Sequence, residues 1–388
     1  MNSGNKICPI CTHPGLVEIY AQVSVPVHSV VLVREHHRAA NFPTGDIQLV
    51  CCEYCGFAFN STFNPVQMKY SEDYEETQSY SPTFSHHQES LARILVDRFD
   101  LKQRRIVEVG CGKGEFLSLL CNIGANHGIG FDPGFDPLRI TLPENVSVKQ
   151  TLFDRDQQLD NIDFIACVMT LEHISQPVAF LQDLRHAIGV QNPVVFFQVP
   201  DAQRIYQHGA FWDIYHEHCN YFTDVALSCA FERAGFAVQE VSRTFSDQYL
   251  TIVAKPDKSI ATTTSINSKF SVKFAGFPAR VSQHKQVMME AILENHSHGG
   301  RLALWGGGSK AVALLTVLDI DGQQCRVVDI NTHKHNSYLP GSGHRVYSPE
   351  SLQQYAPTLV IIMNGAYEKE IIQQLDSFDL QPKLIILP

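Results

Sequence analysis

Two histidines, a glutamate and a tyrosine lie together in the block Tyr215-His216-Glu217-His218. The imidazole of His218 titrates near neutral pH, so it is a candidate base, and the phenol of Tyr215 can donate a hydrogen bond. Glu217 is expected to orient or tune His218. The two histidines are two positions apart, so the block is not the zinc-binding His-Glu-x-x-His pair of a helix. The alternative is an aromatic-rich packing segment with incidental histidines.

A second acid–imidazole pair, Glu172-His173, follows residues 162–169, which predict a buried strand. Ligands of open parallel sheets bind at the carboxyl ends of the strands. We therefore expect Glu172 and His173 to line a site.

A glycine turn, Gly110-x-Gly112-x-Gly114, is the third chemical feature. The residues Arg105–Val109 predict a strand before it, and apolar residues through Leu120 predict a helix after it. Glycines let the backbone approach a ligand closely, and the free N–H groups of the helix face that ligand.

Acidic residues flank this turn. Glu108 precedes it, and Asp132 ends a second expected strand about 20 residues further on, the spacing at which a carboxylate reaches ribose hydroxyls. Turn and acids resemble motif I of class I S-adenosylmethionine (SAM) methyltransferases, which implies that they bind SAM. Asp154, after an expected strand at Val146–Phe153, is then a neighbour of the adenine. An ordinary strand–helix turn of another α/β protein is the alternative.

Four cysteines form two C-x-x-C pairs, Cys8 with Cys11 and Cys52 with Cys55. Each pair places two thiolates on one side of a bend, and two pairs supply the four sulfurs of a tetrahedral Zn²⁺ site. Such a site is closed, so we assign it to folding. Buried or redox-active thiols are the alternative.

Residues 63–85 are rich in Tyr, Ser, Glu and Gln and have poor periodicity, which predicts a loop or short helices. Loops between domains often cover active sites, so Tyr70 and Tyr74 are candidate substrate contacts. A solvated linker whose tyrosines pack on the next domain is the alternative.

Strands and helices alternate from the first glycine turn onward, which predicts an α/β fold with a doubly wound parallel sheet. The pattern divides the chain into a zinc-binding part (1–62), a connecting segment (63–85), a SAM-methyltransferase-like domain (86–258) and a C-terminal Rossmann-like α/β domain (259–388). Long helices are expected at His86–Phe99 and from about Val272 to Asn295.

The last domain contains a second glycine turn, Gly306-x-Gly308-x-x-Ala311, with Asp329 about 20 residues further on. This formally fits a dinucleotide fingerprint, but a lone fit is weak. Gly306, Gly308 and Lys310 are candidate phosphate contacts, since a helix N-terminus favours anions.

The composition limits the partners. The 388 residues are 44% hydrophobic and carry a net charge of −10, which argues against sequence-independent nucleic-acid binding through phosphate neutralisation. We see no secretion signal and no apolar run of membrane-spanning length. Because four of the eleven cysteines have metal spacing, we expect a reduced, cytoplasmic protein.

Together these features resemble the nucleotide-sugar C-methyltransferases that act on 4-keto-deoxysugars. That family has a four-cysteine zinc domain, a central SAM fold and a C-terminal Rossmann-like domain. The resemblance covers the whole chain, and the Tyr-His-Glu-His block is its most discriminating part. It implies SAM and structural Zn²⁺ as cofactors and a nucleotide sugar as substrate. His218 is then the general base that forms an enolate at C3, with Tyr215 or His173 donating a hydrogen bond to the enolate oxygen.

The chain departs from the family in the second glycine turn and in residues 329–334, which read Asp-Ile-Asn-Thr-His-Lys. Three alternatives follow: an O- or N-methyltransferase, a nicotinamide-dependent oxidoreductase that uses the second glycine turn, and a zinc-knuckle interaction protein with a degenerate central fold. The nucleotide, the sugar and the oligomeric state stay open.

Overall fold

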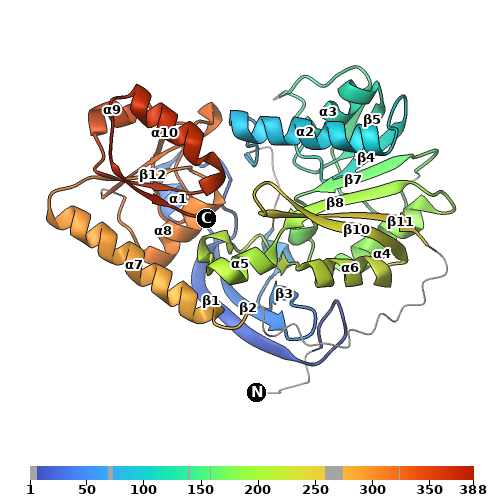
Figure 1. Cartoon of the computed structure of the whole chain (residues 1–388), viewed down its shortest axis with the longest axis horizontal. Coiled ribbons are helices and arrows are strands. Elements are labelled where there is room, and N and C mark those ends of the chain that lie inside the picture. The colour runs from blue at the N-terminus through green and yellow to red at the C-terminus, as the bar shows by residue number, and fades with distance from the viewer. Residues whose placement is uncertain (1–6, 69–72, 139, 158, 258–273, 323) are drawn as a thin grey trace.

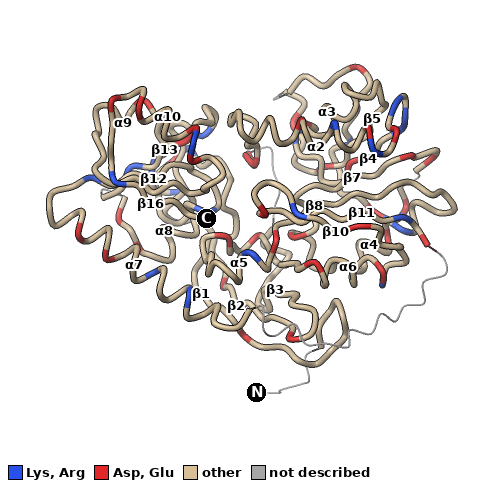
Figure 2. Tube along the Cα trace, viewed as in Figure 1, with Lys and Arg blue, Asp and Glu red and all other residues tan. Residues whose placement is uncertain are grey.

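The structure is a computed structural model that describes residues 7–68, 73–138, 140–157, 159–257, 274–322 and 324–388. Figure 1 shows three sheets. The C-terminal domain (orange to red) lies beside the central domain (cyan to yellow), and the strands of the N-terminal part (blue) lie below both. Lysine and arginine are interspersed with aspartate and glutamate over the described chain (Figure 2). Among the described residues, no helix is long and apolar enough to cross a membrane.

The N-terminal part is a four-stranded antiparallel sheet. Its strands are β1 (Leu16–Pro26), β2 (Thr44–Cys52), β3 (Ala58–Asn60) and β9 (Asn220–Tyr221). The short helices α1 (His36–Ala40) and η1 (Pro65–Gln67) accompany it. The fourth strand, β9, belongs to the central domain and is separated from the Tyr-His-Glu-His block only by Cys219. The N-terminal sheet therefore holds this block in place through main-chain hydrogen bonds.

The central domain is a seven-stranded sheet in the order β10-β11-β8-β7-β4-β5-β6. The strands are β4 (Arg105–Val109), β5 (His127–Phe131), β6 (Val146–Lys149), β7 (Phe164–Val168), β8 (Val194–Pro200), β10 (Phe236–Thr244) and β11 (Tyr249–Pro256). All neighbouring strands are parallel except β11, which runs antiparallel to both β8 and β10. This order, with one reversed strand, is the class I SAM-methyltransferase fold, so the predicted fold class is confirmed.

Helices cover both faces of the central sheet. The helices of this domain are α2 (Pro82–Arg98), α3 (Glu115–Gly124), η2 (Leu171–His173), α4 (Pro177–Ile188), α5 (Ala202–His208), η3 (Phe211–Asp213) and α6 (Asp224–Arg233). Of these, α5 and η3 pack in a core shared with the N-terminal sheet and the C-terminal domain. Helix α2 begins four residues before the predicted start at His86. The Ser81 side chain caps it by accepting a hydrogen bond from the Phe84 N–H, and Pro82 occupies the first turn. Both residues favour a helix start.

The C-terminal domain is a five-stranded parallel sheet in the order β14-β13-β12-β15-β16. Its strands are β12 (Leu302–Trp305), β13 (Cys325–Val328), β14 (Val346–Tyr347), β15 (Leu359–Ile362) and β16 (Lys383–Ile386). Its helices are α7 (Phe277–Ser297), α8 (Ser309–Leu318), η5 (Thr332–Lys334), α9 (Ser351–Tyr355), η6 (Gly365–Tyr367) and α10 (Glu368–Ser377). The predicted start of the long helix, Val272, lies outside the described residues.

The N-terminal sheet shares hydrophobic cores with both other domains. Ile19 and Leu49 pack in one buried cluster with Trp212 of the central domain and Leu304 of the C-terminal domain. The four zinc-spaced cysteines belong to a second cluster with the central strands β7 and β8. Since apolar contacts are continuous across these boundaries, the N-terminal part connects the other two domains.

Candidate active site

A cavity of about 700 Å³ lies between the central and C-terminal domains. It is lined by both glycine turns, by the Glu-His pair, by most of the Tyr-His-Glu-His block and by part of the connecting segment. The predicted residues that line it are Tyr74, Glu108, Gly110, Gly112, Asp132, Glu172, His173, Tyr215, Glu217, His218, Gly306, Gly308 and Lys310. Predicted residues from the connecting segment, the central domain and the C-terminal domain therefore meet at one cavity. Tyr70 lies outside the described residues.

The first glycine turn joins β4 to α3, as predicted. Gly110, Gly112 and Gly114 all have positive φ angles, of 68°, 52° and 77°, which other residues adopt only with strain. A Cβ atom at Gly110 would also lie 2.1 Å from the Thr170 Oγ1. The tight turn therefore requires glycine and leaves its backbone open to the cavity.

The acids around this turn are placed differently from one another. Asp132 accepts hydrogen bonds from the N–H groups of Gly112 (2.9 Å) and Gly134 (2.8 Å) at the end of β5. Burial raises the pKa of Glu108 to about 8. Asp154 is exposed, accepts from the Asp156 N–H and is absent from the cavity lining, where Leu152 and Phe153 appear instead. Strand β6 ends at Lys149, five residues before Asp154, and a place for Asp154 beside the adenine stays a prediction.

The Tyr-His-Glu-His block divides between two environments. The ring of His218 lies 4.6 Å from the ring of His173 and 4.5 Å from the ring of Tyr215, measured between centroids. His216 instead packs into the N-terminal sheet, where a Cβ at Gly45 would lie 2.4 Å from its Nε2. Of the two histidines, only His218 faces the cavity.

Burial holds both cavity histidines in the neutral form. Burial, followed by the neighbouring His173, lowers the pKa of His218 well below its usual value, while Glu217 opposes this shift. Burial likewise lowers the pKa of His173. A neutral imidazole has a free lone pair, so His218 is able to accept a proton at neutral pH.

Glu217 does not contact His218 in the way we expected. Its carboxylate accepts hydrogen bonds from the Tyr74 hydroxyl (2.8 Å), the Ser29 N–H (3.1 Å) and the Ser29 hydroxyl, and it pairs with the His28 Nδ1 (3.3 Å). Although burial raises its pKa, these hydrogen bonds and the nearby imidazoles lower it to about 2. Glu217 is therefore an ionised group that acts on His218 through its charge and anchors Tyr74.

The second glycine turn joins β12 to α8. The Gly307 N–H donates to Asp329 (2.8 Å), whose carboxylate also pairs with the Lys334 Nζ (3.1 Å). Lys310 faces the cavity but pairs with Asp213 (2.7 Å), which also pairs with Arg204 (3.2 Å). Two cations thus share one carboxylate at the cavity wall.

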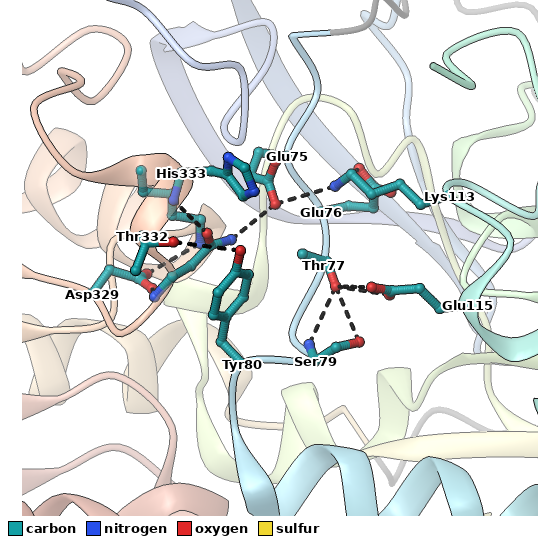
Figure 3. A network of polar contacts seen from close by, with 12 residues as sticks. Glu75, Glu76, Thr77, Ser79, Tyr80, Lys113, Glu115, Asp329, Thr332 and His333 are labelled. Carbon is teal, nitrogen blue, oxygen red and sulfur yellow. Dashed lines mark hydrogen bonds and ion pairs between the residues drawn. The ribbon is translucent and has the colours of Figure 1, made fainter. Parts of the chain in front are cut away.

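The connecting segment crosses between the two glycine turns (Figure 3). Glu75 is fully buried, and its Oε1 contacts the Lys113 Nζ (3.1 Å) and the Asn331 amide (2.9 Å). Next along the chain, the Glu76 carboxylate lies over Gly112, and Thr77 donates to Glu115. One acidic residue therefore links the loop beside the first turn to the loop beside the second.

The four zinc-spaced cysteines meet at one buried point. Their sulfur atoms all lie within 4.8 Å of one another, with 3.7 Å between Cys8 and Cys55 and 3.4 Å between Cys11 and Cys52. Four sulfurs about 2.3 Å from a central Zn²⁺ would be spaced in this way. The cluster lies away from the cavity lining, which agrees with the prediction that it is not catalytic.

Several site residues were not predicted from the sequence. His28 and Ser29 lie nearly 190 positions from their partner Glu217. Gln248 and Asn364 exchange two side-chain hydrogen bonds (2.8 and 2.9 Å) between the central and C-terminal domains. Nothing in the local sequence marks such pairs.

Comparisons with known proteins agree with this architecture. Residues 84–241 match the family model described as "Methyltransferase domain", and residues 254–388 match "C-methyltransferase C-terminal domain". The C-methyltransferase NovU of Streptomyces niveus is 22% identical over 96% of this chain and 92% of its own length. A tRNA U34 carboxymethyltransferase of Dichelobacter nodosus is 28% identical over 29% of this chain and 39% of its own length. A solved SAM-dependent methyltransferase structure from Aquifex aeolicus is 18% identical, with a TM-score of 0.35 over 42% of this chain and 88% of that one.

The protein is a SAM-dependent methyltransferase. The sheet order, the glycine turn with its acids and the domain match all identify this class. The match of the C-terminal domain and the full-length similarity to NovU together support SAM-dependent C-methylation. These findings favour a methyltransferase over the two alternatives of an oxidoreductase and a degenerate interaction protein.

Proposed function

We propose that the protein methylates a carbon atom, C3, next to the ketone of a nucleotide-linked 4-keto-deoxysugar. The observation that carries the proposal is that neutral His218 and two donors, Tyr215 and His173, face the same cavity as the SAM turn. An O- or N-methyltransferase needs a base, but it has no use for donors gathered around a ketone oxygen. The full-length similarity to a C-methyltransferase supports the same choice.

Methylation of carbon requires a carbanion equivalent, and a neighbouring ketone supplies it by enolisation. His218 takes the proton from C3, and Tyr215 or His173 donates a hydrogen bond to the oxygen where negative charge develops. The charge of Glu217 raises the pKa of His218 and so stabilises the imidazolium that forms. The first glycine turn and Asp132 would hold SAM, which would supply the methyl group to this carbon.

The nucleotide diphosphate is assigned to the second glycine turn. Helix α8 begins at Ser309, so its free N–H groups face the cavity beside Gly308. Lys310 and Arg204 have only Asp213 as a shared counter-ion among the ion pairs of the described residues. Since these two cations share one carboxylate, a diphosphate beside them would supply a further negative charge for them to pair with.

The cysteine cluster is assigned to structural Zn²⁺. The sulfur spacing fits a tetrahedral site, and all four cysteines are buried. The ion would fix the turn that precedes β3, and β3 pairs with β9. Zinc would thus support the catalytic block from a distance and take no part in the reaction.

The proposal is tested by deuterium uptake at C3 of a thymidine-diphospho-4-keto-6-deoxy sugar in D₂O without SAM, followed by mass spectrometry. We expect uptake with the wild-type protein and none with His218→Ala, which should bind SAM with near-normal affinity in calorimetry. A variant that loses SAM affinity, or one that exchanges as fast as the wild type, would count against His218 as the base.

A further inference from the structure

Glu172 is a buried acid for which the mechanism above has no role. It lies in η2 at the carboxyl end of β7, and its residue is 1% exposed. It lines the cavity, yet neither carboxyl oxygen has a hydrogen-bond partner among the described residues. Burial disfavours the charged form and raises the pKa of Glu172 to about 8, although the residue's own backbone N–H opposes this shift. At neutral pH Glu172 is therefore an O–H donor with no acceptor.

The position of Glu172 shows where an acceptor would lie. One side-chain atom each of Glu172, His173 and His218 can be chosen so that all three lie within 4.8 Å of one another. Two donors no further apart than that can both contact a single oxygen at about 2.8 Å. A ketone oxygen between Glu172 and His173 would thus have its neighbouring carbon close to His218.

We propose that Glu172 is a catalytic residue that, as a neutral carboxylic acid, donates a hydrogen bond to the ketone oxygen of the substrate. This inference rests on the proposed function and adds an acid to it. His218 takes the proton from the carbon, and the electrons of the C–H bond move into the C=C bond of the enolate. The negative charge that develops on the oxygen is held by the O–H of Glu172 and the ring of His173.

The remaining steps balance without another reactant. The C=C electrons form the new bond to the methyl group of SAM as the S–C bond breaks, and its electrons stay on sulfur. The oxygen returns to a ketone, Glu172 keeps its proton, and His218 releases the substrate proton to solvent. A carboxylic acid kept neutral by an apolar site stabilises an enolate in this way in ketosteroid isomerase.

Several titratable groups face Glu172, and their pKa values decide which of them changes its protonation state near pH 8. They are His173 on the same element, His218 at the end of the Tyr-His-Glu-His block, Cys219 directly after it, Cys167 on β7 and Tyr249 on β11. Burial raises the pKa of Cys219 and of Tyr249 to about 12, and it raises the pKa of Cys167 well above the usual value. Burial lowers the pKa of both histidines. Glu172 is therefore the group in this cluster that loses its proton near pH 8.

The test uses the full-length protein with two matched variants, Glu172→Gln and Glu172→Met. The amide of Gln retains an N–H donor of similar shape, whereas Met fills the space without one. The assay is deuterium uptake on thymidine-diphospho-4-keto-6-deoxyglucose in D₂O without SAM, from pH 6 to pH 9.5. SAM affinity and metal content per chain are measured for each variant as controls for folding and for bound ions.

We expect Glu172→Met to lose about 10²- to 10³-fold in uptake, the usual effect of removing one oxyanion donor, and Glu172→Gln to stay within about tenfold of wild type. Wild-type uptake should fall above about pH 8, as the donor ionises, and this fall should be absent in Glu172→Gln. All three proteins should bind SAM equally and contain the same metal.

Other outcomes overturn the inference. If Gln is as damaging as Met and both variants lose a metal ion, the three groups form a divalent-cation site. If Glu172→Met exchanges like wild type, or if Glu172→Gln keeps the alkaline fall, Glu172 is not the donor while the proposed function stands. If the wild type binds SAM but takes up no deuterium, the proposed function fails, and the inference fails with it.

Discussion

Replacing Glu75 by Gln should release the connecting segment from the two glycine-turn loops. Glu75 is fully buried and contacts both Lys113 and Asn331. Breaking a buried ion pair by removing one charge costs about 3–5 kcal/mol. Here the loss is smaller, because Glu76 still pairs with Lys113 at 3.6 Å and the amide of Gln can still accept from Asn331. We therefore expect the free energy of opening this segment to fall by about 2 kcal/mol.

Amide hydrogen exchange measures this opening directly. A loss of about 2 kcal/mol speeds exchange through local opening about thirtyfold, so amides of residues 73–81 should exchange about thirty times faster in Glu75→Gln. Glu370→Gln is the matched control. Glu370 also holds the segment, but its partners are the neutral hydroxyls of Ser81 and Thr83, from which an amide oxygen still accepts. Equal exchange in the two variants would refute the reasoning that the Lys113–Glu75–Asn331 contact holds the segment.

Further predictions concern the anion wall, the zinc cluster and the pH dependence of stability. Lys310→Met should weaken binding of thymidine diphosphate about tenfold or more in calorimetry and leave SAM affinity unchanged; a loss of both affinities would mean that Lys310 is structural. Cys52→Ser should lower the zinc content from one ion per chain and reduce thermal stability, whereas Cys51→Ser, beside it, should retain the ion; equal zinc in both would contradict the site. Because the pKa of Glu172 is raised to about 8, the folded protein binds more protons than the unfolded chain between about pH 4.5 and 8. The stability contributed by this group is present below that range and is lost as the pH rises through it. The free energy of unfolding of Glu172→Gln, measured with denaturant, should therefore increase relative to that of the wild type from pH 5 to pH 8. If the difference in unfolding free energy between Glu172→Gln and the wild type does not change with pH, Glu172 has an ordinary pKa.

The sequence was sufficient for features encoded locally. The glycine spacing of residues 110–114 requires a strand–turn–helix unit, and the structure contains it as β4 and α3. Glu172 and His173 follow a strongly apolar run, so their position at a strand end could be predicted. The four cysteines could be grouped because C-x-x-C turns have few other uses in a chain of this kind.

Contacts between distant segments could not be predicted. Glu217 was expected to orient or tune His218; its charge does raise the pKa of His218, but the hydrogen bonds of its carboxylate to Tyr74, His28 and Ser29, far away in the sequence, could not be predicted. Lys310 was predicted as a candidate phosphate contact, but its ion pair with Asp213 could not be predicted. These pairings depend on how three domains pack, and no local spacing or periodicity encodes that packing.

The identity of the methylated atom tests the account most directly. The protein would be incubated with ¹³C-methyl-labelled SAM and a thymidine-diphospho-4-keto-6-deoxy sugar, and the product analysed by NMR. The account predicts that the labelled methyl group is bonded to C3 and to no heteroatom. A labelled methoxy or N-methyl signal would contradict it and make His218 a base for a hydroxyl or an amine.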